Sequence, residues 1–196
     1  IHDLSENATF EEVAYLLLVG EKPSPDELRS FKNELAQLRE VPEWIIDTVR
    51  RVATKSHPMD TLRTGISLLS HVDPQINSDS HEANLAKAKR LLAVIPTIIG
   101  AGQRAIDGKA VVPSDPSLGH AANLLYVMTG SRPSELMSRA MDVSLILYAE
   151  HEFNASTFTR RVIVSRLSDL YSGMTGAIGA LKGPLHGGAN ERGMEV

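Results

Sequence analysis

The chain has 196 residues, a net charge of −4 and a hydrophobic share of 42%, which is typical of a globular protein with one sizeable core. Its mild acidity argues against a nucleic-acid-binding surface, because binding to a phosphate backbone needs dense basic patches. It contains no cysteine, which excludes disulfides, thiolate metal sites and cysteine nucleophiles.

The sequence also argues against membrane insertion and secretion. The longest apolar stretches, 91–95 and 143–149, fall well short of the roughly 20 residues that a membrane-spanning helix needs. The first residues show no signal-peptide pattern. We therefore expect a cytoplasmic location, and we expect both ends of the chain to be cut rather than natural.

Helical signals follow one another from the start of the chain. Thr9-Phe10-Glu11-Glu12 is a capping box that predicts a helix ending at Gly20. Ser24-Pro25-Asp26-Glu27 is a second capping box, with proline at the first helical position. Pro42 and Pro58 are predicted to begin the next two helices.

The second half of the chain continues this pattern. The longest predicted helix covers about 82–106, a loop follows over 111–116, and further helices are predicted over 118–129, 134–150, 157–170 and 172–181. No run of alternating apolar and polar residues predicts a strand, so the sequence indicates an all-α protein.

Three glycines lie at intervals of three residues in the last predicted helix. Gly173, Gly176 and Gly179 would give that helix a smooth ridge, which favours close packing against another helix. Their spacing does not fit a dinucleotide-binding turn, which also needs a preceding strand.

His186 is the most prominent candidate for chemistry. It lies in Gly183-Pro-Leu-His-Gly-Gly-Ala-Asn-Glu191, between a rigid Gly-Pro pair and a flexible Gly-Gly pair. Proline fixes the direction of the backbone and glycine lets it approach a ligand closely, so the imidazole is expected at a tight, accessible corner.

His151 is the second candidate. It lies where an aliphatic helix should end, and Asn154, Ser156 and Thr157 follow it. These three polar residues are also explained as caps of the next helix. A zinc-binding helix is not supported, because Ala155 occupies the position four residues after His151, where a second histidine is needed. The histidines without a second feature in their favour are His2, His57, His71, His81 and His120.

Four segments together resemble the citrate synthase family, which includes the 2-methylcitrate synthases. They are Asn7–Leu18, Ser56–Gly65, Glu150–Phe158 and Gly183–Glu191. They occur in the family's order and cover nearly the whole chain, and the last two are highly specific.

The resemblance implies a multi-helical large domain over 1–182, with 183–196 forming the active-site turn and the start of a small domain that is otherwise missing. It also implies a homodimer packed through large-domain helices. The expected reaction condenses an acyl-CoA with oxaloacetate and then hydrolyses the thioester, giving citrate from acetyl-CoA or 2-methylcitrate from propionyl-CoA. No metal or redox cofactor is expected.

The same resemblance assigns roles to particular residues. His186 matches the histidine that hydrogen-bonds the thioester oxygen and stabilises the enol, a task that suits a neutral donor. A helix that begins just after the Gly-Gly pair would help to keep the ring neutral. His151 matches the histidine that binds oxaloacetate, and Asn154 is expected beside it.

Other groups that the family needs have no match in this chain. They are the aspartate that takes the proton from the acyl methyl group, a further histidine and the arginines that bind substrate carboxylates. Asp115, Asp142 and Asp169 lack the motif context to replace that aspartate. The 196 residues alone are therefore expected to be nearly inactive.

Two hypotheses of other classes remain open from the residues. One is a non-catalytic helical module that only dimerises, which the existence of a longer native chain would distinguish. The other is a histidine-based metal protein, which would need a metal bound near His151 or His186.

Overall fold

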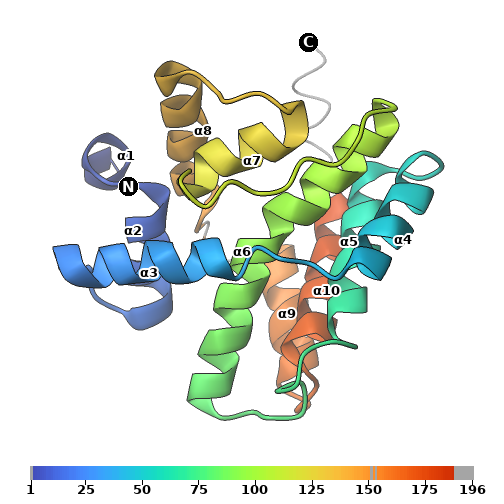
Figure 1. Ribbon diagram of the computed structural model, residues 1–196. Coiled ribbons are helices and arrows are strands. Elements are labelled where there is room, and N and C mark those ends of the chain that lie inside the picture. Colours follow the sequence, from blue (N-terminus) through green and yellow to red (C-terminus); the bar gives the residue numbers. More distant parts are fainter. Residues whose placement is uncertain (1, 151, 153, 188–196) are drawn as a thin grey trace. The chain divides into compact units, whose positions relative to one another are not determined.

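The computed structural model describes residues 2–150, 152 and 154–187, and the regular structure within these ranges is entirely helical (Figure 1). The prediction of an all-α fold is therefore confirmed. The helices of this described part are α1 (His2–Asn7), α2 (Phe10–Val19), α3 (Pro25–Gln37), α4 (Glu43–Ala53), α5 (Pro58–Leu69), α6 (His81–Ile106), α7 (His120–Thr129), α8 (Glu135–Tyr148), α9 (Ala155–Val164) and α10 (Leu170–Lys182).

The chain divides into two compact units. Unit 1 comprises 1–41 and 89–151, and unit 2 comprises 42–88 and 152–196. The helix α6 therefore contributes its first turns to unit 2 and the remainder to unit 1. The expected division into a large domain over 1–182 and the start of a small domain stays a prediction. Within the described ranges, no helix is both long and apolar enough to cross a membrane.

Local sequence signals place most helix ends where they are predicted. The backbone N–H groups of Thr9 and Ser24 each donate to the glutamate three residues on, at 2.8 Å, as the two capping boxes require. Gly20 and Gly130 end α2 and α7 in the left-handed conformation, with φ of 100° and 81°.

The structure differs from the prediction between α9 and α10. The helix predicted over 157–170 begins at Ala155 and ends at Val164. Leu167 then adopts a positive φ of 60°, and the Asp169 carboxylate accepts a hydrogen bond from Ser172 N at 2.9 Å. Leucine is not a residue that signals a left-handed turn, so the early end of α9 leaves no mark in the sequence. The short helix α1 was not predicted either.

Unit 1 is built around apolar side chains from helices that are far apart in the sequence. The helices α2, α3, α6 and α8 contribute to one cluster, which contains Ala8, Phe10, Val13, Ala14, Phe31, Leu35, Ala93 and Ile146. Burial of this apolar surface is the main contribution to the stability of the unit.

Unit 2 depends on the packing of α10 against α9 and α5, while α5 also packs on α4 (Figure 1). A Cβ atom at Gly173 would lie 2.8 Å from Val164 Cγ1, and one at Gly176 would lie 2.4 Å from Ile163 Cδ1. The predicted smooth ridge is confirmed at these two positions. At Gly179 a Cβ atom would meet only Arg63, at an ordinary 3.9 Å.

The glycine ridge gives a testable pair of substitutions. Gly173→Ala should lower the free energy of unfolding by about 1–3 kcal/mol, because Val164 has a stiff side chain and cannot move away cheaply. Gly179→Ala should instead raise it by up to about 1 kcal/mol, because alanine is the better helix former and has space there. Urea unfolding of both variants measures the difference, and equal effects would contradict the packing role of Gly173.

Candidate active site

The turn that carries His186 follows directly from the end of α10. His186 N donates to Gly183 O at 2.9 Å, and Gly187 N donates to Leu181 O at 2.9 Å. A Cβ atom at position 187 would lie 2.6 Å from Leu181 O, so only glycine fits this close approach. The backbone thus folds tightly back on the last turn of α10.

The imidazole of His186 lies against the start of α9. Its Nε2 atom is 3.1 Å from Ser156 Oγ, and the pair is partly buried. Ser156 and His186 are 30 residues apart, and the packing of α9 on α10 brings them together. The histidine that the sequence predicts as functional is therefore held by a side chain as well as by its turn.

Asn154 has the capping role that the sequence predicts. Its Oδ1 atom accepts from Thr157 N at 2.6 Å and from Ser156 Oγ at 2.7 Å. Within the described residues its Nδ2 group makes no hydrogen bond, so it is available to donate to a bound carboxylate. The expected role of Asn154 in binding substrate stays a prediction.

The backbone just before Asn154 is strained. Glu152 has a positive φ of 61°, which is uncommon for a residue with a side chain, and its carbonyl accepts from Asn154 N at 3.0 Å. Such strain is often found at functional sites. His151 lies outside the described residues, as do 188–196 and the helix expected after the Gly-Gly pair.

The contacts of Ser156 constrain the protonation of His186. Asn154 Oδ1 accepts from a backbone N–H, so it is the amide oxygen, and the Ser156 hydroxyl proton can point to it. That arrangement requires His186 Nε2 to carry a proton and donate to Ser156. If the hydroxyl proton turns to Nε2 instead, a neutral ring carries its proton on Nδ1. The hydroxyl proton of Ser156 therefore has two alternative acceptors, Asn154 Oδ1 and His186 Nε2.

The sequence predicts Ser156 only as a helix cap and gives no local sign of its contact with His186. It gives no sign either of the ion pair between Lys182 and Asp60, which lies beside the turn at 2.5 Å. Ser156 lies within the segment Glu150–Phe158 and Asp60 within Ser56–Gly65, so their place in these two motifs was the available signal.

Comparison with known proteins decides the family. The sequence profile described as "Citrate synthase, C-terminal domain" matches residues 1–196. The chain belongs to the citrate synthase family. It is 48% identical over its whole length to the 2-methylcitrate synthase of Shewanella oneidensis and 47% identical to citrate synthase 2 of Bacillus subtilis. It covers 52% and 53% of these two proteins, so it spans about half the length of such relatives.

Solved structures of citrate synthases agree with the fold. The citrate synthase of Pyrobaculum aerophilum matches with a TM-score of 0.88 at 39% identity, over 97% of this chain and 50% of that one. The citrate synthase of Thermoplasma acidophilum, solved as a ternary complex with carboxymethyl coenzyme A and oxaloacetate, matches with a TM-score of 0.91 at 30% identity. It is covered to the same extent, 97% and 50%.

Three aspartates of this citrate synthase-family chain, which lack the motif context of a catalytic base, have structural partners. Asp142 accepts from Phe10 N at 3.0 Å and pairs with Arg139, Asp115 pairs with Arg132 and accepts from Ser117, and Asp169 caps α10. Within residues 2–150, 152 and 154–187, no group of three potential ligands could hold a metal ion. The expected absence of a metal and of a redox cofactor stays a prediction.

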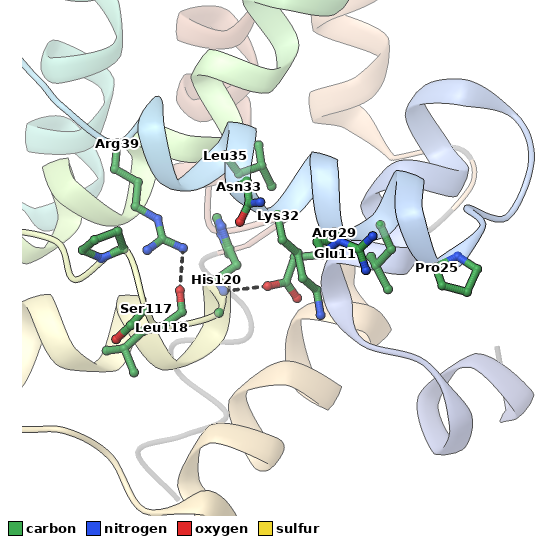
Figure 2. Close-up of a pocket in the computed structure, with 13 residues that line it drawn as sticks. Glu11, Pro25, Arg29, Lys32, Asn33, Leu35, Arg39, Ser117, Leu118 and His120 are labelled. Atoms are coloured by element: carbon green, nitrogen blue, oxygen red, sulfur yellow. Dashed lines mark hydrogen bonds between the residues drawn. The ribbon is translucent and has the colours of Figure 1, made fainter.

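Unit 1 contains a separate groove of about 360 Å³ between α3 and the loop that precedes α7 (Figure 2). On its floor Arg39 donates to the carbonyls of Asp115 and Leu118, at 2.8 and 2.9 Å, and Glu11 Oε1 accepts from His120 N at 2.9 Å. None of the site residues predicted from the sequence lines this groove. Its buried charges hold the loop onto α2 and onto the segment just after α3.

His120 lies on the floor of this groove and is 5% exposed. Its ring packs 5.0 Å from that of Phe10, and its Nδ1 atom has no hydrogen-bond partner in the described part of the chain. Burial lowers the pKa of His120 to about 4, against the opposing attraction of Glu11. This histidine is therefore neutral at physiological pH and acts as a packed ring.

His120 should make the stability of the protein depend on pH. Between its usual pKa of 6.5 and about 4, the unfolded chain binds a proton that the folded chain does not. The contribution of neutral His120 to the free energy of unfolding is therefore fully present above about pH 6.5. It falls as the pH drops towards 4, by up to about 3 kcal/mol at about 1.4 kcal/mol per pKa unit.

The measurement is urea unfolding at about pH 7 and about pH 5, compared between the wild-type protein and His120→Phe. Phenylalanine keeps the ring packing and removes the titration, so the variant should lose less stability between these two values. An identical loss in both proteins would show that His120 does not bind the proton.

Proposed function

We propose that this chain is part of a citrate synthase-type enzyme that condenses an acyl-CoA with oxaloacetate and hydrolyses the thioester, with His186 stabilising the enol of the acyl group. The observation that carries the proposal is the contact of His186 Nε2 with Ser156 Oγ. It occupies one ring nitrogen from the protein side. Nδ1, which has no partner in the described part of the chain, remains to meet the substrate.

The proposed role requires Nδ1 to donate a hydrogen bond to the thioester oxygen. In a neutral ring this means that Nε2 accepts the proton of Ser156, so the hydroxyl turns from Asn154 to His186 when substrate is bound. As a base removes a proton from the acyl α-carbon, charge develops on the thioester oxygen and the donated hydrogen bond strengthens. The enol carbon then attacks the ketone of oxaloacetate, and water later releases CoA.

We propose His151 and Asn154 for the binding of oxaloacetate. The strained corner at Glu152 and the free Nδ2 of Asn154 support a ligand at this position. The Thermoplasma acidophilum relative was solved with oxaloacetate and a CoA derivative bound, which supports the same pair of ligands for this enzyme. We place the base and the carboxylate-binding arginines of the family in the half of such proteins that this chain does not cover.

The acyl group is acetyl or propionyl, giving citrate or 2-methylcitrate. Identity to relatives of the two kinds is nearly the same, at 48% for a 2-methylcitrate synthase and 47% for a citrate synthase. One methylene group in an apolar pocket changes specificity by only about 1–3 kcal/mol, so one site can use both.

We further propose a cytoplasmic homodimer, acting in the tricarboxylic acid cycle when the acyl group is acetyl. Two apolar side chains of α9, Phe158 and Val162, are 69% and 47% exposed. Clustered apolar surface of this kind is typically covered by another domain or another subunit.

His186→Ala in the full-length protein tests the function directly. Loss of a donor to a developing oxyanion typically lowers kcat by about 10²–10³-fold, and the dimer should stay intact on size-exclusion chromatography. Thioester release is followed with acetyl-CoA and with propionyl-CoA, and the faster of the two identifies the substrate. His71→Ala, at an exposed histidine of the same unit, is the matched control. Full activity of His186→Ala would refute the role of His186, whereas no thioester release by the wild-type protein with either acyl-CoA would leave only the non-catalytic dimerisation module.

Ser156→Ala tests the protonation argument. Without the hydroxyl proton Nε2 loses its donor, so the Nδ1–H form is less favoured and kcat should fall about 3- to 10-fold, the worth of one hydrogen bond. Ser156→Thr keeps the hydroxyl and should retain most activity. Nitrogen-15 NMR of the His186 ring reports which nitrogen carries the proton, and an unchanged tautomer with unchanged kcat would rule the argument out.

A further inference from the structure

The motif His57-Pro58-Met59-Asp60 has no role in the reaction as proposed so far, yet it lies beside the turn of His186. His57 caps α5 by accepting from Met59 N at 3.2 Å, and Asp60 follows in the first turn of that helix. The Asp60 carboxylate accepts a hydrogen bond from Lys182 Nζ at 2.5 Å across 122 residues of sequence. The N-terminal end of α5 is thus connected to the C-terminal end of α10.

Lys182 lies directly before the turn that carries His186. It is the last residue of α10, and Leu181 beside it supplies the carbonyl that closes the turn by accepting from Gly187 N. His186 follows four residues later. A displacement of the Lys182 end of α10 would therefore be passed directly to the imidazole.

Charges at the junction reinforce the contact. Arg63 Nη2 lies 2.9 Å from the other carboxylate oxygen of Asp60, and the hydrogen bond from Lys182 is the main cause that lowers the pKa of Asp60 below its usual value. Asp60 also lies at the positive end of the α5 dipole and Lys182 at the negative end of the α10 dipole. The helix dipoles therefore favour the same charges at the two helix ends as the ion pair does.

The opposite end of α10 is tied down in the same way. The Tyr171 hydroxyl donates to the carboxylate of Asp73, just after the end of α5, and Tyr171 is completely buried. With Lys182 on Asp60, α10 is attached near both ends of α5. An ion pair that is partly exposed usually contributes little to the free energy of unfolding, so stability alone is a weak reason for the Lys182 contact.

We propose that the ion pair between Asp60 and Lys182 positions His186, by fixing the end of α10 from which its turn begins. Asp60 and Lys182 are then positioning residues, which act through the turn and not on the substrate. This inference rests on the proposed function of His186. It gives the segment around His57 a purpose in the site that the motif alone does not reveal.

The test uses the full-length enzyme with Lys182→Met, Asp60→Asn and the double variant. Each single variant should lower kcat about tenfold, because a small displacement of a reacting group has a large effect on rate, while KM for oxaloacetate changes less than about twofold. The double variant should be no slower than the slower single one, since the second change removes the partner of a pair already broken. Lys182→Arg keeps the charge and should restore most of the activity.

Lys89→Met is the matched control. It breaks an ion pair of similar length, 2.8 Å to Glu34, in the unit that does not contain His186. It should leave kcat unchanged. Lys182→Met and Asp60→Asn could lower the thermal midpoint and still show the wild-type kcat at temperatures well below that midpoint. The pair would then be only structural, and the proposal would be overturned. Asp60→Asn conserves shape, so it remains informative if Lys182→Met does not fold.

A readout independent of turnover separates this inference from the proposed function. Deuterium exchange at the imidazole C2–H of His186, measured by mass spectrometry, should change in Lys182→Met and stay constant in Lys89→Met. Constant exchange in both variants would overturn the positioning role even if His186→Ala is inactive. Full activity of His186→Ala together with altered exchange in Lys182→Met would instead refute the role of His186 and leave the mechanical link intact.

Discussion

The close approach of α9 and α10 is the constraint on which the candidate site depends. Cβ atoms at Gly173 and Gly176 would overlap Val164 and Ile163, so the two helices can lie this close only where α10 has no side chain. The first turn of α9 then reaches the segment that follows α10, and Ser156 comes within hydrogen-bond distance of His186. Packing in the middle of two helices thus sets a polar contact at their ends.

The site itself is assembled from helix ends. Asn154 caps α9, Lys182 ends α10 and Asp60 lies in the first turn of α5. Helix ends carry unpaired backbone groups and partial charge, so polar side chains gather there for local reasons. Ser156, which hydrogen-bonds Asn154, also contacts His186, and Lys182 lies just before its turn, so residues at helix ends connect to the candidate site.

The sequence predicts the helices well because short capping motifs mark their ends. Examples are the capping box of Thr9 with Glu12 and the C-terminal glycines at 20 and 130. The sequence predicts the end of α9 badly, because Leu167 adopts a left-handed turn that no such motif marks. His186 is predicted from the residues next to it in the sequence. The contacts of Ser156 and Asp60 cannot be predicted in this way, because each joins segments 30 or more residues apart, and only tertiary packing brings them together.

The hydroxyl of Ser156 has a kinetic consequence. Changing the acceptor of its proton from Asn154 to His186 requires one rotation about a C–O bond and one proton exchange with water, and no heavy atom moves. Side-chain rotations of this kind take picoseconds to nanoseconds, far faster than the turnover of a typical enzyme. Under the proposed mechanism, the protein can therefore keep its helix cap fully hydrogen-bonded at rest, and the exchange of the imidazole proton with water, not the hydroxyl rotation, sets how soon Nδ1 becomes a donor.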